Sequence, residues 1–163
     1  HAISMIVKNL PECPKLDVEC LLNTKTAAAM ASLGSVGGGI NTATAHHVGG
    51  IFDVPHGDAN AIMLPHSMRF NAEASADRQA LIAQAMGIDT SAMSDYDAAL
   101  AAADAVEDLR DSLGLPNRLR DVGVPEEGLE LIASATLQDR SLATNPTPVT
   151  DAGPIMSVLR SSW

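Results

Sequence analysis

Aromatic side chains are nearly absent from this sequence, although its apolar content is that of a globular protein. Hydrophobic residues make up 46% of the 163 residues, whereas aromatic residues make up 2%. The core must therefore be built from Ala, Leu, Ile, Val and Met. Because Ala, Leu and Met favour helices, whereas strands prefer aromatic and β-branched side chains, the composition predicts an all-α fold. The length suits one core, so we expect residues 1–163 to form a single helical domain.

Apolar periodicity, together with glycine and proline stops, divides the chain into about seven or eight helices. The main helical segments are expected at residues 1–10, 17–45, 56–71, 75–86, 96–113, 125–136 and 151–163. We expect the second segment to continue through the glycines of 34–39, because small residues in a packed domain permit close approach of another helix or a ligand. Residues 51–55 are expected to form a connector, and 139–148 an irregular loop. Pro65 predicts a kink.

The charge of the chain excludes several classes of partner. The formal net charge is −10, and the few Lys and Arg residues are scattered. Because phosphate binding needs a basic face, neither nucleic acid nor an anionic membrane is expected as a partner. No apolar stretch has the length needed to span a bilayer. Cys13 and Cys20 fit no metal or disulfide framework, so we expect reduced thiols in a cytoplasmic protein.

Four of the five histidines lie between residues 42 and 71. His56 stands between a proline and a glycine, at the junction of a loop and a helix, where space is left beside the ring. His46 lies one helical turn after Thr42, so these two side chains share a face. Imidazole serves as a metal ligand, a general acid or base, or a proton relay. A catalytic metal needs about three or more protein ligands, and few carboxylates stand nearby in the sequence. A structural role for each histidine therefore stays open.

The same stretch resembles the signature of the iron-containing (group III) alcohol dehydrogenases. In that family a pattern A-H-x-x-G-G is followed by P-H-G-x-A-N-A-I-x-L-P-H-x-x-R-F-N. This sequence reads AHHVGG over residues 45–50 and PHGDANAIMLPHSMRFN over 55–71. The segments AISMIVKNL (2–10), LRDVGVP (119–125) and LATNP (142–146) are also similar to family motifs. The resemblance covers nearly the whole chain.

The resemblance implies a fold and a role. The chain is similar to the C-terminal, multi-helix bundle-like domain of that family, which is dehydroquinate synthase-like, and the N-terminal α/β domain that binds NAD(P) is expected to be absent. In the family a divalent metal, held by one Asp and three His, polarises an alcohol or aldehyde oxygen. Hydride then passes between the substrate and the nicotinamide. We therefore expect an oxidoreductase domain that needs an N-terminal half or another subunit, and that associates into an oligomer.

Three positions of this sequence match positions of the family's active site. His56 matches the last metal-ligand histidine, iron or zinc being the expected metal. His46 matches a histidine beside substrate and nicotinamide, which suits it to relay a proton. Thr42 occupies the position of another ligand histidine, and the remaining two ligands would lie before residue 1. His66 matches a motif histidine that we interpret as structural.

Three alternatives remain open at this stage. The domain could be a non-catalytic structural or regulatory subunit that has lost its metal. It could belong to a maleylacetate reductase-type protein, although that signature tends to read P-H-A where this chain has Gly57. A third hypothesis is a new metal site made by His46, His47, His56 and Asp58. Bound metal in the purified chain would argue against the first alternative.

Overall fold

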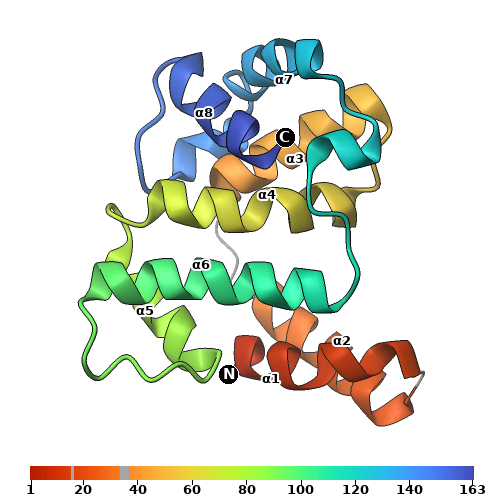
Figure 1. The fold of residues 1–163 in the computed structure, drawn as a ribbon, viewed down its shortest axis with the longest axis vertical. Helices are drawn as coiled ribbons and strands as arrows, with labels where there is room; N and C mark the ends of the chain where they lie inside the picture. Colours follow the sequence, from red (N-terminus) through yellow and green to blue (C-terminus); the bar gives the residue numbers. More distant parts are fainter. Residues whose placement is uncertain (16, 34–36) are drawn as a thin grey trace.

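The computed structural model of the protein describes residues 1–15, 17–33 and 37–163. In this part of the chain eight α-helices form and no strand is present, which confirms the all-α fold (Figure 1). The α-helices are α1 (Ala2–Asn9), α2 (Val18–Leu33), α3 (Gly39–Phe52), α4 (His56–Asn71), α5 (Ala76–Ala85), α6 (Asp95–Ser112), α7 (Leu129–Thr136) and α8 (Ala152–Ser162). Short 3-10 helices connect them: η1 (Leu10–Lys15), η2 (Leu119–Val122), η3 (Glu126–Gly128) and η4 (Arg140–Thr144).

Helix α4 lies in the middle of the molecule and contacts helices on both sides (Figure 1). On one side it packs against α3 and α8, and α7 contacts both of these helices. On the other side it packs against α6, which in turn covers α5. Helices α1 and α2 pack mainly against each other at the far end. The molecule therefore has one helix, α4, shared by two cores.

The larger core is built from branched aliphatic side chains. Its largest fully buried members come from α3, α4, α7, α8 and the turns between them: Ile40, Val48, Ile62, Met63, Leu119, Val124, Leu129, Ile132, Ile155 and Leu159. The C-terminal Trp163 closes this core, because its indole N–H donates to the carbonyl of Val124 at 2.9 Å. The smaller core, between α4, α5 and α6, is made mostly of alanine. Alanine lets helix axes approach closely, so α5 and α6 need no large side chains between them.

The predicted helix over 17–45 is wrong at its centre, because the chain forms two helices there. Helix α2 ends at Leu33 and α3 begins at Gly39. Gly37 and Gly39 have φ angles of 82° and 59°, which a right-handed helix does not allow. The part of this prediction that concerns residues 34–36 lies outside the described residues. The predicted close approach is present, because a Cβ atom on Gly37 would overlap the side chain of Thr144.

Smaller differences concern the helix ends. Helix α3 continues to Phe52, and Asp53 ends it in the left-handed conformation at φ 55°. Helix α4 runs unbroken through Pro65. The predicted irregular loop over 139–148 contains η4. Ser75 immediately precedes α5, but its hydroxyl donates to the carbonyl of Asn71 at 2.8 Å and does not cap the helix.

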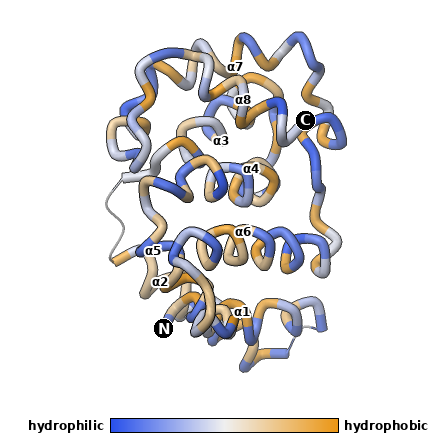
Figure 2. The backbone as a smooth tube through the Cα atoms, turned by 60° about the vertical axis from the view of Figure 1, so that its left-hand side comes forward, coloured by the Kyte–Doolittle hydropathy of each residue, from blue (hydrophilic) through white to orange (hydrophobic). Residues whose placement is uncertain are grey.

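Helices α1 and α2 bury very little of their apolar surface. Asn9 is the buried residue of α1 and Ala27 that of α2, among the residues that the structure describes. Hydrophobic residues occur along both helices (Figure 2). Several large apolar side chains on α2 are exposed: Val18, Leu21, Leu22, Met30 and Leu33. No helix in the described ranges is both long and apolar enough to cross a bilayer.

Candidate functional site

The connector between α3 and α4 brings two predicted site histidines together. Asp53 turns the chain, and the extended Pro55 leads directly into α4, so the two helices fold back on each other. His46 lies on α3 and His56 is the first residue of α4. Their rings stack with centroids 5.7 Å apart and planes inclined by 22°. Both residues are exposed, so the pair faces outward from the domain.

An acidic residue from a distant loop holds this histidine pair in place. Asp139 Oδ2 lies 3.2 Å from His46 Nδ1. The other oxygen of the same carboxylate accepts a hydrogen bond of 2.7 Å from the backbone N–H of Ser141, which caps η4. The carboxylate therefore fixes the position of the His46 ring relative to a backbone segment.

The charge of Asp139 decides the orientation of the His46 proton. Partial burial favours a higher pKa for Asp139, but the hydrogen bonds from Ser141 and His46 outweigh it, so the pKa lies below its ordinary value. Because an ionised carboxylate only accepts hydrogen bonds, the proton of His46 sits on Nδ1. In the neutral ring Nε2 is then the nitrogen without a proton, so it can accept a hydrogen bond.

His47 lies beside the same carboxylate but is held differently. Its Nε2 is 3.4 Å from Asp139 Oδ2, at an angle that gives no hydrogen bond. The side chain is 29% exposed, compared with 46% for His46. Neighbouring positions on a helix point about 100° apart, so His47 does not share the outward face of His46.

Sequence reasoning did not find Asp139. It lies 93 residues from His46 and was assigned to an irregular loop. The one local signal is the spacing Asp139-Arg140-Ser141, in which an aspartate can cap a helical turn. That signal predicts the cap but does not reveal the histidine.

Two asparagines join the helices next to the histidine pair. Asn41 Nδ2 donates to Asn60 Oδ1 at 2.8 Å, and Asn60 Nδ2 donates to the carbonyl of His56 at 2.8 Å. These bonds connect the first turn of α4 to α3 and fix the position of the His56 backbone. Thr42 lies beside Asn41 in the first turn of α3, with its side chain against Gly38.

The residues of this chain do not by themselves fit a metal ion. Among the described residues, no three His, Cys, Asp or Glu side chains are grouped so that they could hold one. The alternative set of His46, His47, His56 and Asp58 is therefore not assembled. Thr42 offers only a hydroxyl, which is a poorer ligand for iron or zinc than imidazole or carboxylate.

Two motif asparagines have a structural role. Asn71 and Asn145 form a reciprocal amide pair, with hydrogen bonds of 3.0 and 2.8 Å. Asn145 Oδ1 also accepts from the backbone N–H of Ile40 at 2.9 Å, and its Nδ2 donates to the carbonyl of Thr147. This buried pair joins the start of α3, the end of α4 and the loop after η4. It holds the segment that follows Asp139.

Comparison with known proteins identifies the family of this chain. The model of the Fe-containing alcohol dehydrogenase family, C-terminal, matches residues 1–163. The chain is 36% identical over 150 residues to the 1,3-propanediol dehydrogenase of Citrobacter freundii. The aligned residues make up 90% of this chain and 39% of that protein. It is 39% identical over 129 residues to the lactaldehyde reductase of Escherichia coli (strain K12), covering 79% and 34% respectively. The chain therefore belongs to the C-terminal domain family of the iron-containing alcohol dehydrogenases.

Solved structures show the same fold. A crystal structure of a 1,3-propanediol oxidoreductase superposes with a TM-score of 0.93 at 32% identity, over 99% of this chain and 43% of that one. The maleylacetate reductase of Burkholderia cepacia is a further relative, 30% identical over 119 residues, which are 73% of this chain and 30% of that enzyme. The chain spans about 40% of the length of these relatives. It corresponds to the C-terminal part of a longer type of protein.

Proposed function

We propose that this chain is the substrate-side domain of an NAD(P)-dependent alcohol dehydrogenase, and that it acts only together with an N-terminal nucleotide-binding half. The observation that carries this proposal is the outward-facing His46, oriented by Asp139 and stacked on His56. A second support is the family membership of a chain that spans only part of its relatives. The substrate would be a small alcohol or aldehyde, and the assembled protein an oligomer.

In this proposal His46 moves the proton of the reaction. The alcohol carbon gives a hydride to the nicotinamide, which is the chemistry that NAD(P) supplies when bound. The hydroxyl proton passes to His46 Nε2 and from there to solvent, and the reverse path protonates the carbonyl during reduction. Asp139 is a positioning residue, because it holds Nδ1 protonated and leaves Nε2 as the acceptor.

The metal of the family cannot be assigned to this chain alone. The resemblance places His56 at one ligand position and Thr42 at another, and the described residues supply no complete set. The proton transfer proposed for His46 therefore does not depend on a bound metal. If the assembled enzyme contains one, we expect His56 to contribute a ligand and the N-terminal half to contribute most of the others.

The decisive experiment joins the missing half to this chain. The N-terminal segment of the Citrobacter freundii 1,3-propanediol dehydrogenase is fused ahead of residue 1, and NAD(P)H oxidation is measured with simple aldehydes. The chain alone should show no turnover, whereas the fusion should be active. His46→Gln should lower kcat by about 10²–10⁴-fold, as expected for a lost acid–base group.

Matched variants separate the proton role from folding. His47 lies beside the same Asp139 carboxylate, and the His47→Gln variant should keep most of the activity. Asp139→Asn should lower kcat more than it changes KM, and Asp139→Glu should restore part of it. Full activity in the His46→Gln fusion would overturn the proposed proton transfer, whereas turnover by the unfused chain would overturn its dependence on a second half.

A non-catalytic role is the second candidate, and Thr42 favours it. A domain with one imidazole and one hydroxyl at the ligand positions should not hold iron or zinc tightly. Metal content is measured by plasma mass spectrometry on the purified chain, with His56→Ala as control. Near-stoichiometric metal that the variant loses would reject the non-catalytic role. A maleylacetate reductase-type activity is tested by offering maleylacetate to the same fusion.

A further inference from the structure

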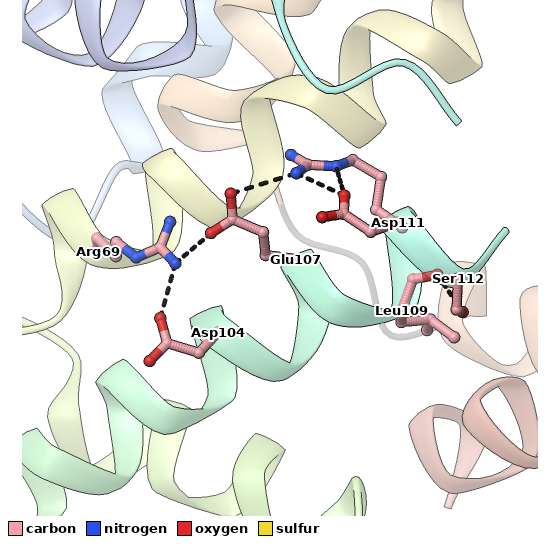
Figure 3. A network of polar contacts seen from close by, with 7 residues as sticks. Arg69, Asp104, Glu107, Leu109, Asp111 and Ser112 are labelled. Atoms are coloured by element: carbon pink, nitrogen blue, oxygen red, sulfur yellow. Dashed lines mark hydrogen bonds and ion pairs between the residues drawn. The ribbon is translucent and has the colours of Figure 1, made fainter. Parts of the chain in front are cut away.

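A chain of ion pairs crosses from α4 to α6 (Figure 3). Arg69 Nη2 donates to Asp104 Oδ1 at 2.7 Å and also to Glu107 Oε2. The other oxygen of Glu107 accepts from Arg110 Nη2 at 3.2 Å. Arg110 also donates from Nε and Nη2 to Asp111 Oδ1, at 2.9 and 2.8 Å. The carboxylates of this network are therefore already engaged.

Arg110 is the unusual member of this network. Its side chain is 4% exposed, and its Nη1 is buried with no hydrogen-bond partner among the described residues. A guanidinium carries five N–H donors, and leaving a charged donor unpaired in a buried site costs more than leaving a neutral one. Arg110 also lines a pocket whose other lining residues are all polar or charged, so an acceptor in that pocket could pair with this nitrogen.

A pocket of about 240 Å³ lies next to Arg110. Its lining includes the Arg118 side chain and His66, with Asn117 and Ser161 at its edge. Because a water molecule takes up about 30 Å³ in the liquid, the pocket has room for several waters or for one small polyatomic ion. The pocket therefore has both the space and an unsatisfied donor.

The ionised side chains that line the pocket balance, two guanidiniums against two carboxylates, so an anion there would depend on the position of the unpaired N–H and not on net charge. Glu107 and Asp111 also line it, but their contacts to Arg110 engage their charges. Arg118 makes no ion pair with any described residue, so its positive charge is not neutralised. Burial keeps His66 neutral, since it lowers the pKa of this ring from 6.5 to about 4. A neutral imidazole can still donate one hydrogen bond to an anionic oxygen.

We propose that this pocket binds a small oxyanion, a phosphate or a carboxylate, held by Arg110 Nη1 and Arg118. The oxyanion would accept from the unpaired N–H of Arg110, with the neutral ring of His66 as a further hydrogen-bond donor. His66 follows His56 on α4 by ten residues, about 15 Å along the helix axis. The pocket is therefore separate from the proposed proton-transfer site and does not depend on it.

The test is a calorimetric titration of the full chain with inorganic phosphate and, separately, with acetate, in buffer kept at constant ionic strength with chloride. Saturable binding is expected for at least one of them. Saturation by phosphate alone identifies a phosphate site, and saturation by acetate as well identifies a general oxyanion site. Absence of saturable binding by both would overturn the proposal.

Two arginine variants provide the matched comparison. Arg118→Gln removes an exposed charge beside the pocket and should weaken binding by about tenfold, as expected for one charge-assisted hydrogen bond. Arg120→Gln removes a nearby exposed charge that lies over Trp163, with Cζ 5.5 Å from the ring, and should leave the affinity unchanged. Equal weakening by both variants would mean that binding depends only on the net charge of the protein, and would overturn the proposed oxyanion site.

A second readout follows the His66 ring directly. A bound anion adds negative charge beside the ring, so its pKa should rise from about 4 when phosphate saturates the pocket. The charged groups around this ring, Glu107, Arg69, Arg110 and Arg118, are the same with and without phosphate, so a difference between the two titrations reports the bound ion. The shift is measured from the imidazole resonances by NMR. An unchanged His66 titration at saturating phosphate would place the ion elsewhere.

Discussion

The α3–α4–α7–α8 region and the α1–α2 pair are both rich in apolar residues, but they use them in opposite ways. The first region buries most of its large aliphatic side chains, and Ile62 and Ile155 are at 0% exposure. In the α1–α2 pair, Leu33 is 90% exposed and Leu22 is 61% exposed. A helix that is apolar on all sides is normally enclosed by other elements. The difference shows that apolar content identifies the helices, whereas the burial of each helix depends on which other elements pack against it.

The contrast also shows where apolar surface is left uncovered among the described residues. The core of the first region is filled by side chains from its own helices. The exposed side chains of α2 form a surface that an additional element could cover. The chain covers 39% of the 1,3-propanediol dehydrogenase of Citrobacter freundii and 43% of the 1,3-propanediol oxidoreductase structure, so both relatives are more than twice as long. The proposed need for an N-terminal half rests partly on this observation.

The largest expected effect comes from deleting the same amount of side chain in each region. Ile62→Ala should lower the free energy of unfolding by about 2–5 kcal/mol, because it leaves a cavity in a filled core. Leu22→Ala should change it by less than about 0.5 kcal/mol, because the side chain is already exposed. Both are measured by urea denaturation monitored by circular dichroism. Comparable losses would show that α2 is buried in solution.

A somewhat smaller effect is expected where the larger core is held by polar contacts. Asn145→Ala removes the acceptor of the Ile40 N–H and the partner of Asn71, both of which are buried. Buried groups left without partners should lower the free energy of unfolding by about 1–3 kcal/mol. Denaturation curves give the value. Asn60→Ala serves as the control, since its bonds are partly exposed and should contribute less. An unchanged denaturation midpoint for Asn145→Ala would show that the Asn71–Asn145 pair does not stabilise the fold.

The smallest expected effect lies at the border between the two cores, where His66 of α4 faces α6. Its pKa is about 4 in the folded protein and 6.5 in the unfolded reference, so the unfolded state binds the proton more readily. The free energy of unfolding should therefore decrease as the pH falls from about 6.5 to about 4, and be unaffected by this group above that window. Because the ring is partly exposed, we discount the effect to about 1 kcal/mol.

The His66 contribution is separated from that of the carboxylates by a difference measurement. Thermal unfolding of the wild type and of His66→Gln is compared at pH 7 and at pH 4.5, without phosphate. The variant should lose less stability over this interval. Parallel loss in the two proteins would mean that His66 does not titrate differently in the folded state.

Most helices were predictable from the sequence, and the site was predictable only in part. The segments that became α4, α5, α6 and α8 were correct to within a few residues, because capping residues, stops and apolar spacing act locally. The break between α2 and α3 was missed, since it depends on Gly37 adopting a positive φ to clear Thr144, which lies more than a hundred residues away in the sequence. His46 and His56 were selected by their motif, and the structure brings their rings together.

The sequence by itself determined the helical class, the family and the two motif histidines, because helices form through contacts between residues three or four positions apart. Only the tertiary structure decided which residues complete each site. Asp139 reaches His46 across 93 residues, and Asn145 reaches Asn71 across 74. It also decided that Arg110 is buried while Leu33 is exposed, against the usual preference of both residue types. These outcomes depend on how distant helices pack, which local spacing does not encode.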